Sequence, residues 1–179
     1  MCGSTESRGA LVTGATRGIG KAIAQELAKA GHTVIGTATS DSGAERIMSH
    51  LSVWGGVGMR LDVSDTEAVK AAIAEVAEQH GAPTILVNNA GITRDNLMMR
   101  MKDEEWTDVI GTNLNPLFTV SKACLRGMTK ARWGRIINIS SVVGQMGNAG
   151  QANYAASKAG AEGMSRAMAK ELGSRAVTV

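Results

Sequence analysis

Short apolar, β-branched runs alternate along this chain with longer stretches of helical periodicity. The short runs predict strands at residues 10–13, 33–37, 57–61, 85–87 and 135–139. The longer stretches predict helices at residues 19–30, 44–53, 66–80, 104–131 and 154–172. Ser64 with Glu67 fits a capping box for the third helix. Residues 176–179 look like the beginning of a sixth strand.

This alternation of strands and helices is typical of repeated βαβ units. It predicts an α/β protein with a Rossmann-type doubly wound parallel sheet flanked by helices. The length of 179 residues fits one domain, which we place at residues 10–179 after an N-terminal tail at residues 1–9. No apolar run approaches the ~18 residues of a membrane span. The first eight residues contain no apolar signal-peptide segment. We therefore expect a cytoplasmic protein with no membrane partner.

Composition narrows the possible functions. Residues of the AVILMFWYC set make up 44% of the chain, which is ordinary for a globular protein. The net charge of +3 is too small to indicate nucleic-acid binding, and the few aromatic residues do not interleave with Lys and Arg. The chain has only two cysteines and three scattered histidines, so we expect no disulfide framework and no metal site.

A glycine-rich turn follows the first predicted strand. The sequence Thr13-Gly14-Ala-Thr-Arg17-Gly18-Ile-Gly20 leads directly into a helix. In this context glycines let the backbone approach a pyrophosphate at the helix N-terminus. The spacing is G-x-x-x-G-x-G rather than G-x-G-x-x-G, and alone it would also fit a simple tight turn. The strand before it and the helix after it favour nucleotide binding.

The second strand bears on the choice between NAD and NADP. No acid stands at its end, where a carboxylate would bind the ribose hydroxyls of NAD. Arg17 and the hydroxyls of Thr39 and Ser40 suit a phosphate instead, which favours NADP. Asp41, one residue further on, complicates this interpretation. Asp62, after the third strand, would either accept a hydrogen bond from the adenine amino group or cap the next helix.

Three side chains predict proton-transfer chemistry. Tyr154 and Lys158 are four residues apart, which places phenol and ammonium on one face of a helix, where the cation favours phenolate. Such a tyrosine can exchange a proton with a substrate. Ser141 follows the strand at 135–139, so its hydroxyl would lie at the carboxyl end of the sheet, where parallel sheets bind ligands. The Tyr-x-x-x-Lys spacing alone would also fit an exposed helical pair.

Together these motifs resemble the short-chain dehydrogenase/reductase family. The matching residues, in the family's order, are Thr13, Gly14, Gly18, Gly20, Asn88, Asn89, Ala90, Gly91, Asn113, Ser141, Tyr154 and Lys158. Residues 89–106 and 142–154 resemble, within that family, the bacterial 3-oxoacyl-[acyl-carrier-protein] reductases of fatty acid biosynthesis. The resemblance implies reduction of a 3-oxoacyl thioester by NADPH to the 3-hydroxyacyl product.

The resemblance also implies roles for individual residues. Ser141 would polarise the ketone, Tyr154 would donate the proton, and Lys158 would favour the phenolate and hold the nicotinamide ribose. Asn113 would position a water linked to Lys158, whereas the residues alone indicate a polar side chain at a local kink. The implied cofactor-binding residues are Gly14, Thr16, Arg17, Gly18, Ile19, Gly20, Thr39, Asp62, Val63, Asn89, Ala90, Gly91, Tyr154 and Lys158.

An acyl carrier protein is acidic, so Arg132 and Arg175 are candidate docking residues; they also fit solvated cations near helix C-termini. The resemblance implies a homo-oligomer built through helices 104–131 and 154–172. Family members continue past a sixth strand, so we expect a C-terminally incomplete fold that lacks its last strands. Two alternatives therefore stay open: an acetoacetyl-CoA-type reductase, and a truncated, catalytically silent subunit that binds nucleotide or a sister chain.

Overall fold

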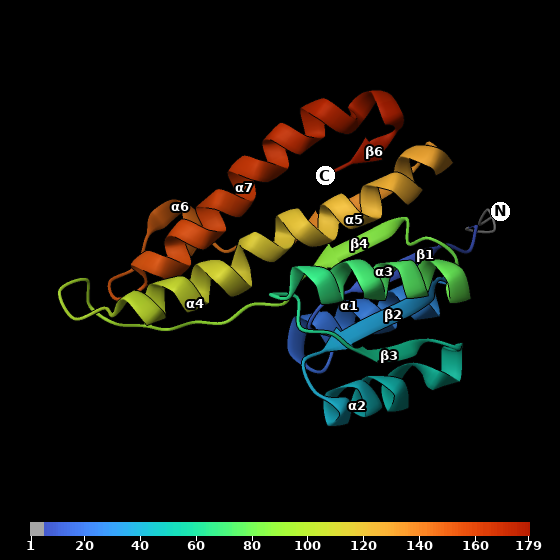
Figure 1. Cartoon of the computed structure of the whole chain (residues 1–179), viewed down its shortest axis with the longest axis horizontal. Helices are drawn as coiled ribbons and strands as arrows, with labels where there is room; N and C mark the ends of the chain where they lie inside the picture. The colour runs from blue at the N-terminus through green and yellow to red at the C-terminus, as the bar shows by residue number, and fades with distance from the viewer. Residues whose placement is uncertain (1–5) are drawn as a thin grey trace.

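The computed structural model describes residues 6–179; Cys2 and most of the predicted tail lie outside this range. Six parallel strands form one sheet in the order β3-β2-β1-β4-β5-β6 (Figure 1). The strands are β1 Gly9–Val12, β2 Thr33–Ala38, β3 Val57–Arg60, β4 Ile85–Asn88, β5 Gly134–Asn138 and β6 Val177–Thr178. The predicted Rossmann-type parallel sheet is therefore confirmed.

Helices cover both faces of the sheet (Figure 1). The α-helices are α1 Gly18–Lys29, α2 Asp41–Leu51, α3 Thr66–His80, α4 Asp103–Asn113, α5 Asn115–Ala131, α6 Val143–Met146 and α7 Ala152–Leu172. Short 3-10 turns, η1 Ser52–Trp54 and η2 Gly173–Arg175, follow α2 and α7. Within residues 6–179, no helix combines the length and the apolar character that a membrane span requires.

The hydrophobic core has two layers, one on each face of the sheet. Leu11 and Leu86 pack with α3, α5 and the end of α7, whereas Val12 and Val87 pack with α1 and α2. Successive residues of a strand point to opposite faces, so a strand covered on both sides reads as a continuous apolar run. This is why the pattern in the sequence predicted a buried parallel sheet.

The predicted helix at 104–131 is two helices, which corrects the sequence prediction. α4 ends at Asn113 and α5 begins at Asn115, with Pro116 in its first turn. Proline has no backbone N–H and its ring clashes with the preceding turn, so a helix cannot run through it unchanged. The break matters because it fixes the position of Asn113.

The predicted capping box of Ser64 with Glu67 is also wrong. Asp65 is the N-cap of α3, and its carboxylate accepts hydrogen bonds from the backbone N–H groups of Glu67 and Ala68, both at 3.0 Å. The Ser64 hydroxyl instead donates to Asp62 at 2.7 Å. Aspartate is as good a cap as serine, and here its position one residue closer to the helix decides the outcome. Asp62 is therefore not the cap of α3.

Candidate functional site

A cavity of about 590 Å³ lies at the carboxyl ends of the strands, beside the N-terminus of α1. The predicted cofactor-binding residues that line it are Gly14, Thr16, Arg17, Gly18, Ile19, Gly20, Thr39, Asp62, Val63, Asn89, Ala90 and Gly91. The sequence analysis did not identify the other lining residues, which are Thr37, Ala38, Leu61, Ile92 and Thr112. The glycine turn and the segments after three further strands thus enclose one space.

The glycines of the turn are required by its backbone. Gly14 and Gly18 have φ of +66° and +56°, a region that disfavours residues with a Cβ. A Cβ at Gly18 would have no atom within 4 Å, so this glycine leaves open space at the wall of the cavity. A Cβ at Gly20 would collide with the carbonyl oxygen of Gly14 and the side-chain amide of Asn89. The turn therefore packs tightly against the protein and leaves its other side free.

The turn is held by the segment that follows β4. The Thr13 hydroxyl oxygen accepts hydrogen bonds from the backbone N–H groups of Asn89 at 3.0 Å and Ala90 at 3.1 Å. In return, the Asn89 side-chain amide donates to the carbonyl oxygens of Thr13 and Gly14, both at 3.0 Å. The neighbouring Asn88 donates to Asn138 at 2.8 Å and so links β4 to β5. The two asparagines brace the sheet at its central crevice.

At the end of β2, the acid that complicated the cofactor assignment points elsewhere. The Asp41 carboxylate pairs with Arg60 at 3.1 Å and is not among the cavity-lining residues. The Ser40 hydroxyl accepts a hydrogen bond from the backbone N–H of Gly43 at 3.2 Å and caps α2, so it also leaves the cavity wall. Thr39 and Arg17 remain there.

Asp62 lines the same cavity and is held in place by its own loop. The hydroxyl and the backbone N–H of Ser64 donate to one carboxylate oxygen, at 2.7 and 2.9 Å. These hydrogen bonds lower the pKa of the Asp62 carboxyl, which favours the ionised form further. An ionised carboxylate at this wall can accept a hydrogen bond from an amino group.

A second cavity, of about 610 Å³, contains Ser141, Tyr154 and Lys158. The residues that line both cavities are Arg17, Ile19, Asn89, Gly91 and Ile92. The predicted catalytic side chains and the predicted cofactor-binding turn are therefore neighbours across a shared wall. Arg94 and Thr93 also line this second space, which the sequence analysis did not foresee.

The two adjacent serines after β5 have different partners. The Ser140 hydroxyl donates to Glu162 Oε1 at 2.8 Å. Ser141 Oγ accepts a hydrogen bond from the backbone N–H of Val143 at 3.2 Å, which leaves its own proton available. Because a hydroxyl donates only one proton, Ser141 is the better placed of the two to donate to a ligand.

Lys158 is buried and lies beside Tyr154. Its Nζ donates to the carbonyl oxygen of Ile139 at 2.7 Å and lies 5.6 Å from the centre of the Tyr154 ring. Burial lowers the pKa of the Lys158 ammonium, because the charged form loses hydration. Within the described chain, the Tyr154 hydroxyl has no hydrogen-bond partner. The phenol is thus free to meet a group bound in the cavity.

Asn113 is buried at the break between α4 and α5. Its Oδ1 accepts a hydrogen bond from the backbone N–H of Ile92 at 2.8 Å, and its Nδ2 donates to the carbonyl oxygen of Ile92 at 2.9 Å. Nδ2 also lies 3.3 Å from the Ser157 hydroxyl. The side chain thus fixes a residue that lines both cavities. Both amide hydrogens are engaged, so a water at the Asn113 side chain would have to donate to Oδ1.

Arg132 and Arg175 lie at the amino ends of strands β5 and β6, opposite the end of the sheet that borders the cavities. Arg132 ends α5 just before β5 begins, and Arg175 lies in η2 just before β6. Ser141 follows β5, so the five-residue strand separates the arginines from the site by roughly 16 Å along its length. Within one chain, these arginines do not border the cavity that contains Tyr154.

Comparison with known proteins identifies the family. The family model described as short chain dehydrogenase matches residues 8–179. This chain belongs to the short-chain dehydrogenase family. This family consists of oxidoreductases, so membership implies that the chain is an oxidoreductase with a nicotinamide cofactor.

Curated relatives of this short-chain dehydrogenase carry one name. The chain is 64% identical over 178 residues to the 3-oxoacyl-[acyl-carrier-protein] reductase FabG of Pseudomonas aeruginosa. The match covers 98% of this chain and 72% of that protein. The FabG proteins of Vibrio harveyi and Escherichia coli are 59% and 56% identical over 174 residues, across 97% of this chain and 71% of each. The resemblance to the family is therefore confirmed.

Proposed function

We propose that this short-chain dehydrogenase reduces a 3-oxoacyl thioester on acyl carrier protein to the 3-hydroxyacyl product, with NADPH as the reductant. The observation that carries the proposal is the shared wall between the two cavities. It brings Ser141, Tyr154 and Lys158 next to the glycine turn. The identity to reductases of that name, 64% over 178 residues in one case, supports the choice of substrate.

The residues of the first cavity fit a dinucleotide. The open side of Gly18 and the free N–H groups at the start of α1 suit a pyrophosphate, because a helix N-terminus attracts negative charge. Arg17 and Thr39 would bind a 2′-phosphate, and Asp62 would accept a hydrogen bond from the adenine amino group. When bound, NADPH supplies the hydride that reduces the ketone.

The chain's own residues would supply and direct the proton. Ser141 donates a hydrogen bond to the ketone oxygen, and Tyr154 transfers its phenolic proton to that oxygen as negative charge develops on it. Lys158 favours the resulting phenolate through its positive charge. Asn113 keeps the Ile92 segment in place between the two cavities. Two donors, the Ser141 hydroxyl and the Tyr154 phenol, then act on the same ketone oxygen.

The reaction is tested by following NADPH oxidation with 3-oxoacyl thioesters of acyl carrier protein and of coenzyme A. Turnover with a higher kcat/KM for the carrier-protein substrate supports the proposal. A preference for the coenzyme A thioester would favour the acetoacetyl-CoA-type reductase. Nucleotide binding without turnover on either substrate would favour the catalytically silent subunit.

Arg17 provides a test of cofactor choice. We expect Arg17→Ala to weaken NADPH binding about 10- to 100-fold, because one charge-assisted hydrogen bond contributes about 1.5–3 kcal/mol. NADH binding should change much less, since NADH has no 2′-phosphate. Fluorescence titration of both nucleotides measures this, with Arg60→Ala as the control because Arg60 pairs with Asp41 outside the cavity. Equal losses for NADPH and NADH would contradict the assignment.

A charge reversal tests the docking prediction. We expect the double variant Arg132→Glu, Arg175→Glu to lower kcat/KM for the carrier-protein thioester by about tenfold or more at low salt, because it would repel an acidic partner. The value for the coenzyme A thioester should stay constant. Arg60→Glu, a single charge reversal at the end of the edge strand β3, is the control. An equal loss on both substrates would argue against a role in docking.

A further inference from the structure

Glu162 is a carboxylate near the site that the proposed reaction does not use. It lies one helical turn after Lys158 on α7, and only 22% of its side chain is exposed. Its Oε1 accepts the hydrogen bond from the Ser140 hydroxyl at 2.8 Å. Its Oε2 lies 3.3 Å from the side-chain amide nitrogen of Gln145 on α6. One carboxylate therefore joins α7 to the loop after β5 and to α6.

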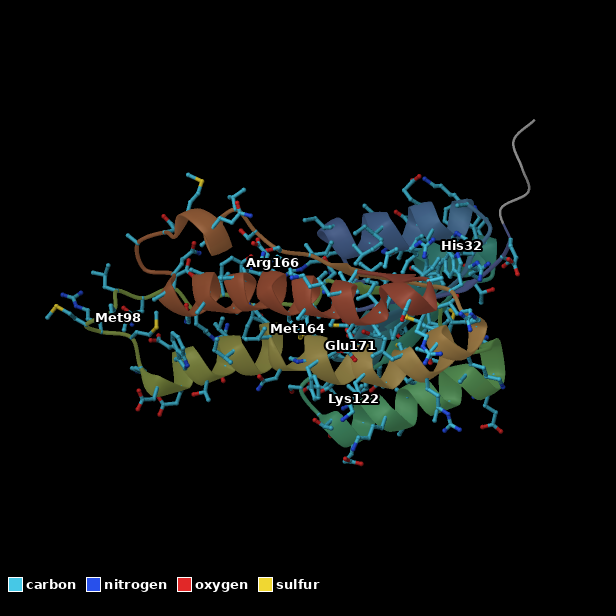
Figure 2. The ribbon with its side chains drawn as sticks, turned by 90° about the horizontal axis from the view of Figure 1, so that it is seen from above. His32, Met98, Lys122, Met164, Arg166 and Glu171 are labelled. Atoms are coloured by element: carbon cyan, nitrogen blue, oxygen red, sulfur yellow. The ribbon has the colours of Figure 1, made fainter. Side chains whose placement is uncertain are left out.

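Of the partners of Glu162, Ser140 lines the cavity that contains Tyr154. The hydrogen bonds from Ser140 and then Gln145 lower the pKa of the Glu162 carboxyl, because both stabilise its ionised form. Its ion pair with Arg166 is long, at 3.8 Å, and the arginine side chain is 71% exposed, so this contact contributes little. Arg166, labelled beside α7 in Figure 2, lines a groove together with Glu162 and Ser140. The hydrogen bonds to Ser140 and Gln145 are therefore the contacts of Glu162 that contribute most.

These contacts constrain the serine next to Ser140. Ser141 Oγ accepts the backbone N–H of Val143 at the start of α6 and lines the cavity that contains Tyr154. Turning the Ser140–Ser141 backbone away from the cavity would break the bond between Ser140 and Glu162. α6 also packs closely on α7, because a Cβ at Gly144 would lie 2.9 Å from the backbone nitrogen of Ala159.

We propose that Glu162 is a positioning residue that holds Ser140 and α6 so that the Ser141 hydroxyl faces the substrate oxygen. This inference rests on the proposed reductase function. Glu162 itself lines neither cavity, although its hydrogen-bond partner Ser140 lines the second one. Its loss should therefore affect the proton-donating side of the site and leave nucleotide binding intact.

The test compares Glu162→Ala with Glu162→Gln in the whole chain, using acetoacetyl-CoA as substrate. We expect Glu162→Ala to lower kcat about 10- to 100-fold, because small misplacements of reacting groups have effects of this size. The dissociation constant of NADPH should not change. Glu162→Gln keeps an oxygen that accepts the Ser140 proton, and it should restore most of the activity.

Two further variants sharpen the comparison. Ser140→Ala removes the same hydrogen bond from the other side, so the double variant should be no slower than Glu162→Ala alone, as expected for groups that act together. Glu171→Ala is the matched control, since Glu171 is an exposed glutamate near the end of α7 (Figure 2). It should keep the kcat of the parent chain.

Distinct outcomes separate this inference from the proposed function. Unchanged kcat in Glu162→Ala, or an equal loss of NADPH affinity, would overturn the positioning role. If the parent chain turns over no thioester, the proposed function fails, and hydrogen exchange of the amides at residues 139–146 decides the inference. Exchange that is faster in Glu162→Ala than in Glu171→Ala would support it, and equal exchange would overturn it.

Discussion

We expect the replacement of Tyr154 with phenylalanine to lower kcat by about 10²- to 10⁴-fold, the usual contribution of a positioned proton donor. The phenol lines the second cavity and its hydroxyl has no partner among the described residues, so the hydroxyl is available to a substrate. Removing it leaves the ring, and with it most of the local packing, in place. The measurement is steady-state oxidation of NADPH with a 3-oxoacyl thioester.

The same variant should bind NADPH with unchanged affinity and unfold at an unchanged temperature. Phe118→Leu is a suitable control, because that aromatic ring on α5 is 58% exposed and lies outside both cavities. A Tyr154→Phe protein that keeps more than about a tenth of the parent kcat would not fit a proton donor of the usual strength. Another group would then have to supply the proton.

Replacing Gly20 with alanine should abolish nucleotide binding and destabilise the fold. The new methyl group would collide with the Gly14 carbonyl oxygen and the Asn89 amide, both of which are fixed by hydrogen bonds. Overpacking of this kind costs about 1–3 kcal/mol in the free energy of unfolding. It would also displace the turn that is proposed to hold the pyrophosphate. Denaturant unfolding and NADPH titration measure the two effects.

Gly173→Ala is the matched control for this change. A Cβ there would have no atom within 4 Å, and the backbone of Gly173 is in the ordinary helical region, with φ of −55°. Its stability and NADPH affinity should match those of the parent chain. If Gly20→Ala bound NADPH normally, the turn would tolerate displacement and could not be the close-contact site that we propose.

The sequence predicted the sheet well because both of its faces are covered. A strand buried on two sides reads as an apolar run, and β1 and β4 are of this kind. The break at Asn113 was missed because helical periodicity continues across it, and only Pro116 marks the change. The cap of α3 was misplaced by one residue, since Ser64 and Asp65 are chemically similar candidates.

The candidate site was predictable where its residues are close in the sequence. The turn from Gly14 to Gly20 is a local motif, and the structure places it on the cavity wall. Arg94 and Thr112 also line the cavities, but no spacing in the sequence distinguishes them. The contact between Ser140 and Glu162 spans 22 residues, so only the folded packing of α7 against the loop after β5 could show it.

The reciprocal hydrogen bonds between Thr13 and Asn89 affect the order in which the chain can fold during its synthesis. Their partners are 76 residues apart, so the glycine turn cannot be completed by its own βα unit. A nascent chain that has exposed only β1, α1 and β2 lacks both the amide and the backbone N–H groups that hold the turn. Forming such a non-local contact requires the closure of a long loop, which slows folding. Competence to bind nucleotide would thus arise only after β4 and the residues through Gly91 have emerged from the ribosome and joined β1.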